Sequence, residues 1–298
     1  MEVMKFGGTS LGNAMRIMHA AGIVQSHAVT GPVLVVVSAM AGITDTLVCI
    51  SEHHSAGEYA KRDALTALVS KKHQDSLEEL ELPSSLYAET RKELDVLLNR
   101  FIEQLSVFAS PLLPHEVDFV VSYGERLSSL LVSAALRKKG VAARHVFGSD
   151  VLVASEEYGN ASALMDESRK RSSQVLQPLF ARGITPVVTG FFGGTAAGTV
   201  ATFGRGGSDY SAAVLAAVLG ADRLTVWKEV DGVFTADPKT DIHARFIERL
   251  SYAKAARMAR AGAKVLHPEC MEPVRAMKIP VYVRNTFRPE FPGTLIYA

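Results

Sequence analysis

The sequence predicts an α/β fold with two lobes, built on an open, mainly parallel β-sheet sandwiched by helices. Short apolar segments rich in β-branched residues alternate with longer segments of helical period, which is the pattern of a parallel sheet. The segment Val33–Val37 is apolar at every position, as a strand buried on both faces requires. Hydrophobic residues make up 48% of the 298-residue chain, which is enough to bury a large core.

The elements follow one another in the order that this fold requires. Strands are expected at Glu2–Phe6, Pro32–Val37, Ala142–Phe147, Thr185–Thr189, Arg223–Trp227 and Ile279–Val283. Helices, several introduced by Ser or followed by Gly as caps, are expected at Met15–Ser26, Glu116–Lys139, Ser208–Leu219, Ser251–Ala261 and Glu269–Met277. The charged segment Ser55–Arg100 has a helical period and is interrupted at Pro83, so we expect a helical hairpin over about residues 55–110, laid over the sheet.

Composition limits the domain organisation and the class of function. We expect one domain, with a substrate lobe over about residues 1–195 and a nucleotide lobe over about residues 196–298. Lys plus Arg (32) nearly balances Asp plus Glu (31) and no basic run occurs, which disfavours binding to nucleic acid or to an anionic membrane. Cys49 and Cys270 lack disulfide or zinc spacing, and neither a signal peptide nor a membrane span is recognisable. A cytoplasmic protein is therefore expected.

The first strand leads into a glycine turn with a lysine just before it. In the segment K-F-G-G-T-S (residues 5–10), Gly7 and Gly8 allow phosphate oxygens to approach backbone N–H groups. Lys5 is placed to neutralise a transferring phosphoryl group. The segment is not a Walker A motif, and a Gly-Gly turn after a strand also serves purely structural ends.

Two further segments carry polar side chains suited to a small substrate. Ser38 and Thr44 follow a buried strand and can donate hydrogen bonds to a ligand at the carboxyl end of the sheet, although Thr44 equally suits a helix N-cap. Glu125 follows Gly124 inside a helical pattern, and because glycine is costly there, we expect another group to approach closely. The Glu125 carboxylate suits a substrate ammonium group; the alternative is a solvated Glu paired with a neighbouring Arg.

The segment T-F-G-R-G-G-S-D-Y-S (residues 202–211) is the most informative one. Its glycines around Arg205 fit a backbone cradle with a guanidinium group directed at a carboxylate. Ser208 and Asp209 begin the next helix. Asp209 either caps this helix or holds an active-site lysine in position.

The segment Lys228–Lys239 follows a strand, turns at an Asp-Gly pair and reaches a proline, which predicts a long surface loop. Lys228 and Lys239 are candidates for contact with nucleotide phosphates, the alternative being solvent-facing lysines. Lys264 and His267 follow in G-A-K-V-L-H-P (residues 262–268). His267 is not expected to act as a base, because a carboxylate nucleophile is already ionised at neutral pH.

In this order and across nearly the whole chain, the segments resemble the aspartokinase branch of the amino acid kinase superfamily. The resemblance rests on K-F-G-G-T-S, V-S-A-x-A-G-I-T, G-E-R-L-S, G-R-G-G-S-D-Y-[ST]-A, D-G-V-x-T-[AS]-D-P and G-A-K-V-L-H-P. It implies the amino acid kinase (carbamate kinase-like) fold, with aspartate in the first lobe and ATP in the second. It also implies transfer of the γ-phosphoryl group to the β-carboxylate of L-aspartate, which opens the biosynthesis of lysine and threonine.

The resemblance also implies a role for individual residues. Lys5 would stabilise the transferring phosphoryl group and Asp209 would orient Lys5. Glu125 would bind the ammonium group of aspartate and Arg205 a carboxylate. The rest of the aspartate pocket would be Ser38, Thr44 and Ser208. The ATP site would comprise Lys5, Gly7, Gly8, Lys228, Glu229, Phe234, Lys239 and Lys264. Mg²⁺ would be held mainly by phosphate oxygens and waters, without direct protein ligands.

Two departures from the family pattern stand out. Many relatives read Trp-Thr-Asp-Val where residues 227–230 read Trp-Lys-Glu-Val, which weakens the assignment of single nucleotide contacts. Aspartokinases commonly continue into paired regulatory domains, whereas this sequence stops at Ala298. We therefore expect no feedback inhibition by lysine, threonine or methionine within this chain, while a separate regulatory chain stays open. A homodimer is the family expectation.

Two alternatives to an aspartate kinase stay open. The first keeps the chemistry but uses another acceptor, such as glutamate, N-acetylglutamate, carbamate or a nucleoside monophosphate. Glu125 beside Arg205 favours a free amino acid. The second is a non-catalytic nucleotide-binding regulatory subunit. The presence of Lys5, Arg205 and Asp209 together opposes it, because a sensor does not need all three.

Overall fold

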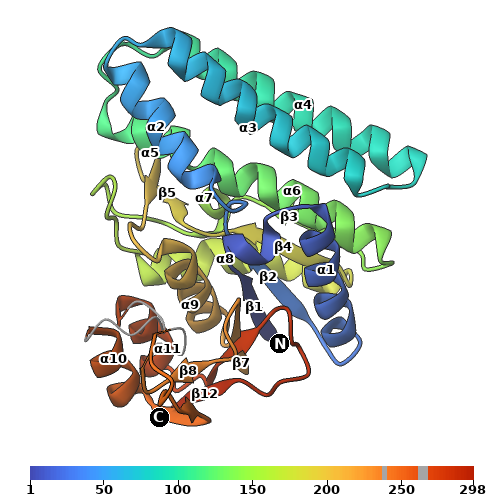
Figure 1. Cartoon of the computed structure of the whole chain (residues 1–298), viewed down its shortest axis with the longest axis vertical. Coiled ribbons are helices and arrows are strands. Elements are labelled where there is room, and N and C mark those ends of the chain that lie inside the picture. The colour runs from blue at the N-terminus through green and yellow to red at the C-terminus, as the bar shows by residue number, and fades with distance from the viewer. Residues whose placement is uncertain (237–239, 261–267) are drawn as a thin grey trace.

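A computed structural model of the chain describes residues 1–236, 240–260 and 268–298 and is organised around one central sheet (Figure 1). The eight-stranded sheet has, in spatial order, β10 (Arg249–Ser251), β12 (Thr294–Tyr297), β11 (Val281–Asn285), β7 (Arg223–Lys228), β1 (Glu2–Phe6), β2 (Val33–Val37), β4 (Thr185–Thr189) and β3 (Ala143–Val146). β11 and β12 pair antiparallel, and the other neighbouring pairs are parallel. The predicted fold class and all six predicted strands are confirmed.

Alternation along the strands divides the core into two apolar clusters, one on each face. In β1, Met4 belongs to one cluster and Val3 to the other, as a strand covered on both sides requires. The Met4 face carries α1 (Ala14–Ala28), α2 (Ile43–Ser55), α5 (Pro114–Val121) and α6 (Tyr123–Lys138). The Val3 face carries α7 (Gly148–Val151), α8 (Met165–Ala181), α9 (Gly207–Leu219), α10 (Tyr252–Arg260) and α11 (Glu272–Ala276), with the 3₁₀ turn η2 (Pro268–Met271).

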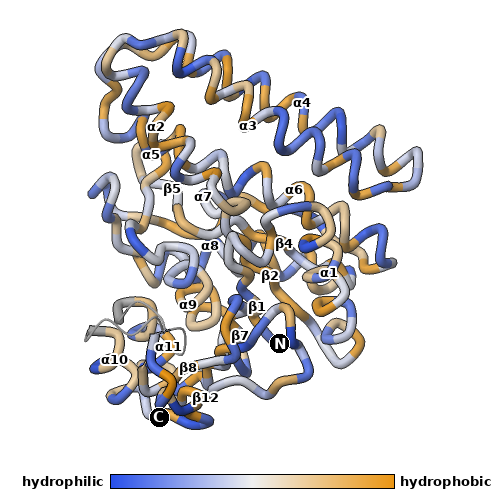
Figure 2. Tube along the Cα trace, in the orientation of Figure 1, coloured by the Kyte–Doolittle hydropathy of each residue, from blue (hydrophilic) through white to orange (hydrophobic). Residues whose placement is uncertain are grey.

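The predicted helical hairpin is confirmed, but its position differs from the expectation. It consists of α3 (Tyr59–Glu79) and α4 (Ser84–Val107), and Figure 1 shows it along one side of the molecule. Polar and apolar residues are interleaved along both helices (Figure 2), so that each buries one side only. The hairpin packs on α2 and α6, which themselves cover the sheet, so it forms an outer layer instead of lying directly on the strands.

Several boundaries were predicted wrongly. The single helix expected over Glu116–Lys139 is divided at Ser122, whose hydroxyl donates to the Phe119 carbonyl. The loop expected over Lys228–Lys239 contains β8 (Val233–Phe234), which pairs with β9 (Phe246–Ile247). The helix α8 and the hairpin of β5 (Phe192–Gly194) and β6 (Val200–Thr202) were not predicted. No helix in the described part of the chain is long and apolar enough to cross a membrane.

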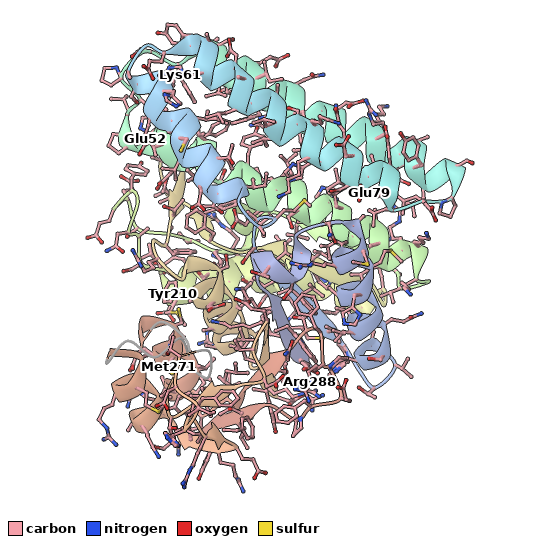
Figure 3. The ribbon with its side chains drawn as sticks, in the orientation of Figure 1. Glu52, Lys61, Glu79, Tyr210, Met271 and Arg288 are labelled. Atoms are coloured by element: carbon pink, nitrogen blue, oxygen red, sulfur yellow. The ribbon has the colours of Figure 1, made fainter. Side chains whose placement is uncertain are left out.

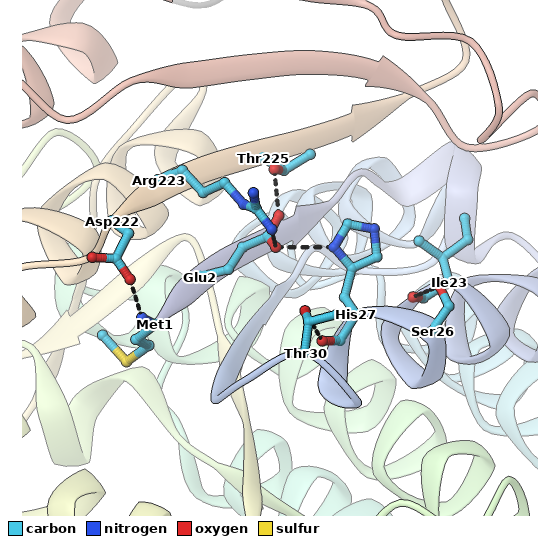
Figure 4. A network of polar contacts seen from close by, with 9 residues as sticks. All are labelled: Met1, Glu2, Ile23, Ser26, His27, Thr30, Asp222, Arg223 and Thr225. Atoms are coloured by element: carbon cyan, nitrogen blue, oxygen red, sulfur yellow. Dashed lines mark hydrogen bonds and ion pairs between the residues drawn. The ribbon is translucent and has the colours of Figure 1, made fainter.

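A polar network around the buried Glu2 carboxylate joins α1, β1 and β7 at the amino ends of the strands (Figure 4). The Glu2 carboxylate accepts hydrogen bonds from His27 Nδ1 (2.9 Å), Arg223 Nη2 (2.8 Å) and Thr225 Oγ1 (2.6 Å). Burial alone raises the pKa of Glu2, but these donors outweigh it and lower the pKa to about 2. The network therefore stabilises the fold, at the end of the sheet opposite the candidate site.

Candidate active site

The carboxyl ends of four neighbouring parallel strands are joined by backbone hydrogen bonds. Ser38 N donates to the Phe6 carbonyl (3.1 Å), Gly190 N donates to the Val37 carbonyl (2.9 Å), and Gly7 N donates to the Trp227 carbonyl (3.2 Å). These contacts bring the loops after β1, β2, β4 and β7 to one edge of the sheet. In open α/β sheets this edge is where ligands bind.

A cluster of two lysines and one aspartate lies at this edge. Lys5 Nζ is 2.5 Å from Asp209 Oδ1, and Lys228 Nζ is 3.3 Å from Asp209 Oδ2. Lys5 and Asp209 are 5% and 7% exposed, so little water screens the pair. Burial raises the pKa of Asp209, but the two ammonium groups outweigh it and lower the pKa to about 2. The cluster therefore has one carboxylate for two lysines, which suits an anionic ligand.

The structure distinguishes between the two roles predicted for Asp209, which were capping helix α9 and holding a lysine. Helix α9 is capped by Gly206 in the left-handed conformation (φ 76°), with no side-chain capping bond. Asp209 instead holds Lys5, so the capping alternative is wrong. Its contact with Lys228 was not predicted, although in a parallel α/β sheet the start of α9 and the end of the following strand β7 lie at the same edge.

Glycine is favoured at positions 7 and 8, directly after β1, for two different physical reasons. A Cβ at Gly8 would lie 2.7 Å from the Ala39 carbonyl oxygen, so packing against the next loop requires glycine there. A Cβ at Gly7 would lie 3.8 Å from Lys5 Nζ, in the space beside the ammonium group. The Gly7 N–H donates to Trp227 and is not available to a phosphate, so Gly7 contributes space rather than a donor.

Glu125 is buried, and one of its oxygens lacks a partner. Oε1 accepts a hydrogen bond from Ala39 N (3.0 Å), while Oε2 is buried without a hydrogen-bond partner. With the side chain only 2% exposed, burial raises the pKa of Glu125 to about 8, against the smaller opposing effects of the Ala39 amide and of Lys5. The alternative of a solvated Glu is therefore wrong. An unpaired buried carboxyl oxygen suits a cationic ligand group.

The close approach expected at Gly124 is confirmed, and the approaching group belongs to the chain itself. A Cβ at Gly124 would lie 2.6 Å from the Ala39 Cβ. The same loop is held by Gly8, whose carbonyl accepts from Ala41 N (3.2 Å), and by Lys72, whose Nζ donates to the Ala41 carbonyl (2.5 Å). Lys72 comes from the hairpin, and burial lowers its pKa. The sequence did not indicate this link between the hairpin and the loop after β2.

The predicted hydroxyl donors lie on this same edge. Ser38 is half-buried directly after β2, and Ser208 is buried in the first turn of α9, so close to Gly190 that a Cβ there would lie 2.8 Å from the Ser208 Cβ. Thr44 is half-buried in the first turn of α2. The N-cap of α2 is Gly42, so the capping alternative for Thr44 is wrong.

Arg205 is exposed, in the turn between β6 and α9. It lines a cavity of about 510 Å³ together with Tyr210, which Figure 3 labels, and Arg169 of α8. Neither Glu125 nor Asp209 lines this cavity. The structure thus does not join Arg205 to the cluster around Lys5, and its role toward a substrate carboxylate stays a prediction.

The predicted nucleotide residues are only partly described. Lys228 ends β7, Glu229 is exposed, and Phe234 is half-buried in β8 with its ring 5.7 Å from that of Phe246. Lys239, Lys264 and His267 lie outside the described residues. Among the described residues, no group of three or more His, Cys, Asp or Glu side chains could hold a metal ion.

The fold and the lysine–aspartate cluster define an α/β protein that gathers two lysines and one aspartate at the carboxyl edge of a mainly parallel sheet. Residues 1–285 match the model of the amino acid kinase family, and the chain belongs to this family. It is similar to the lysine-sensitive aspartokinase 3 of Escherichia coli, with 36% identity over 99% of this chain and 63% of that protein. It is equally similar to the chloroplastic aspartokinase 3 of Arabidopsis thaliana, with 36% identity over 99% of this chain and 52% of that protein.

Comparison with solved structures also finds aspartokinases. The crystal structure of E. coli aspartokinase III in complex with aspartate and ADP superposes with a TM-score of 0.90 and 34% identity. The match covers 100% of this chain and 64% of that one. The chain thus spans between about half and two thirds of the length of these relatives.

Proposed function

We propose that this chain transfers the γ-phosphoryl group of ATP to the β-carboxylate of L-aspartate, forming 4-phospho-L-aspartate and ADP. The observation that carries the proposal is Lys5, a buried ammonium group held by Asp209 at the carboxyl edge of the sheet. The similarity to aspartokinases, one of them in complex with aspartate and ADP, supports the choice of substrates. Aspartate would lie in the first lobe and ATP in the second.

The reaction needs positioning and charge stabilisation more than covalent chemistry. A β-carboxylate oxygen of aspartate forms a bond to the γ-phosphorus while the bond to the bridging oxygen of ADP breaks. Lys5 and Lys228 would stabilise the charge on the phosphoryl group, and Asp209 would keep both lysines in place. Mg²⁺, bound through the ATP phosphates, would neutralise further charge there. No general base is required, because the nucleophile is ionised at neutral pH.

The acceptor would be recognised by its charged groups. We assign the ammonium group of aspartate to Glu125, whose Oε2 atom lacks a partner inside the protein. Ser38, Thr44 and Ser208 would donate hydrogen bonds to the substrate carboxylates, and Arg205 would bind one of these carboxylates. An acylated acceptor has no ammonium group and would leave Glu125 unpaired, so it would bind weakly.

The test is a coupled assay of ADP release with MgATP and a panel of acceptors, with hydroxylamine trapping to detect an acyl phosphate. We expect turnover with L-aspartate well above that with glutamate, N-acetylglutamate, carbamate or UMP. Trapped aspartyl hydroxamate identifies the product directly. Turnover with another acceptor and none with aspartate would refute the acceptor, and binding of MgATP without any turnover would favour a non-catalytic subunit.

A further inference from the structure

The loop after β11 connects two parts of the candidate site through one buried threonine. Thr286 is fully buried, and its N–H donates to the carbonyl of Lys228 at the end of β7 (2.8 Å). Its hydroxyl shares a hydrogen bond with the hydroxyl of Ser10, at the end of the glycine turn (2.7 Å). Its carbonyl accepts from His19 Nε2 of α1 (2.6 Å). Every polar group of Thr286 is therefore used to link separate elements.

Neighbouring side chains hold the same loop on the side of α1. The Arg16 guanidinium lies over the Phe287 ring, 5.1 Å from its centroid, and the His19 ring stacks on Phe287 at 6.4 Å. Arg16 Nη1 also donates to the Thr9 carbonyl in the glycine turn (2.8 Å). The glycine turn and the loop after β11 are thus held by a common support on α1.

The loop is also tied to the predicted nucleotide segment. Asn285 Nδ2 donates to Asp231 Oδ1 (2.7 Å), and Arg288 Nη1 pairs with Asp231 Oδ2 (2.6 Å). Figure 3 labels Arg288 at this loop. Asp231 lies three residues after Lys228, so the contacts of residues 285–288 hold the start of the nucleotide segment from one side.

We propose that Thr286 is a positioning residue, which fixes the Gly7–Ser10 turn relative to Lys228 and thereby sets the geometry of the phosphate site. The inference rests on the proposed function, because it assigns the ATP phosphates to these two elements. Phosphoryl transfer depends on placement, and displacements of about 1 Å reduce rates by up to about 10²-fold. A buried link between the two elements should therefore affect nucleotide use out of proportion to its effect on stability.

The experiment compares Thr286→Val, Thr286→Ser, Ser10→Ala and the double variant of Ser10→Ala with Thr286→Val. Binding of MgADP is measured by calorimetry, kcat and KM for MgATP by the coupled assay, and stability by thermal unfolding without nucleotide. Thr225→Val is the matched control, because its buried hydroxyl donates to Glu2 (2.6 Å) at the opposite end of the sheet. MgADP binding does not depend on which acceptor the protein uses.

We expect Thr286→Val to weaken MgADP binding and to lower kcat/KM for MgATP, each by about 10-fold, with Thr286→Ser within about 2-fold of the wild type. The double variant should be no worse than Thr286→Val, because it removes both members of one hydrogen bond. Thr225→Val should lower stability and leave MgADP binding unchanged.

Three results are decisive against the proposal. Wild-type nucleotide binding and kinetics in Thr286→Val would overturn it, as would equal loss of nucleotide binding in Thr225→Val. If the effects of Ser10→Ala and Thr286→Val on MgADP binding were additive in the double variant, the hydrogen bond between the two hydroxyls would not couple the two elements, which would also overturn the proposal. A wild-type chain that binds MgADP but does not phosphorylate aspartate would refute the proposed acceptor and leave the Thr286 comparison valid.

Discussion

Replacing Glu125 with Gln should stabilise the free protein while impairing its use of aspartate. Glu125 is buried beside Ala39, and burial raises its pKa to about 8. At about pH 7.5 the folded chain keeps this carboxyl protonated, whereas the unfolded chain ionises it at its ordinary pKa. Folding must therefore take up a proton at a pH about three units above the ordinary pKa of the carboxyl group, and this uptake destabilises the folded state.

The magnitude follows from the distance between the working pH and the ordinary carboxyl pKa. With about three pH units between them, the destabilisation at pH 7.5 is about 4 kcal/mol. Because the folded pKa is raised, this loss of stability begins near pH 4.5, grows by about 1.4 kcal/mol per pH unit and levels off near pH 8. Gln cannot ionise and keeps an oxygen that can accept from Ala39 N, so Glu125→Gln should avoid the loss.

Urea unfolding of the wild type and of Glu125→Gln at pH 5, 6, 7 and 8 tests this reasoning. The advantage of the variant should be small at pH 5 and should grow toward pH 8. Glu52→Gln, at an exposed position of α2 that Figure 3 labels, is the control and should show no such trend. The reasoning would be refuted if the stability difference between Glu125→Gln and the wild type did not change with pH, or if the variant were less stable than the wild type at pH 8.

Four further changes test other parts of the site and fold. Lys5→Met should fold and bind MgADP but lose about 10²-fold or more in kcat, since its charge acts mainly in the transition state; a near-normal kcat would make Lys5 structural. Arg205→Ala should raise KM for aspartate by about 10-fold without changing the calorimetric affinity for MgADP, whereas a loss confined to MgADP would reassign the arginine. Gly124→Ala should destabilise the fold by about 1–3 kcal/mol in urea, because the added Cβ clashes with Ala39; unchanged stability would show that the loop yields freely. Glu2→Gln should lower the free energy of unfolding by about 3 kcal/mol at neutral pH. The lowered pKa of Glu2 means that the ionised carboxylate stabilises the fold above about pH 4.5 and that this stabilisation fades toward pH 2. An equal stability difference between the wild type and the variant at pH 3 and at pH 7 would contradict this origin of the stabilisation.

The strands and the hairpin could be predicted because their signals are local. Val33–Val37 is apolar throughout and Pro83 interrupts a helical period, so neither depends on distant residues. The hairpin's position over α2 and α6 could not be predicted, since any apolar helix face would serve as its partner. The short strands β8 and β9 were not predicted, because strands of two residues are too short to leave a periodic pattern in the sequence.

The same distinction applies to the candidate site. Lys5 and Asp209 were predicted from motif and resemblance, and the structure brings them into contact. The Thr286 link to Ser10 joins residues 276 positions apart, and the Lys228 contact with Asp209 joins two consecutive elements. The residue types involved are common on surfaces, so none of them indicates its partner. Only the strand order, which places β7 between β1 and β11, brings these groups together.

The ionisation states of the two buried carboxyl groups give the free site a definite charge. Asp209 is ionised between two lysines, so this cluster carries more positive than negative charge and favours phosphate groups. Glu125 is protonated below about pH 8, so in the free protein it does not offset that charge. An ammonium group bound at its Oε2 atom would favour ionisation of Glu125 and so release a proton. Glu125 would thus acquire its negative charge only when aspartate brings an ammonium group beside it, so that this pair of groups adds no net charge to the site.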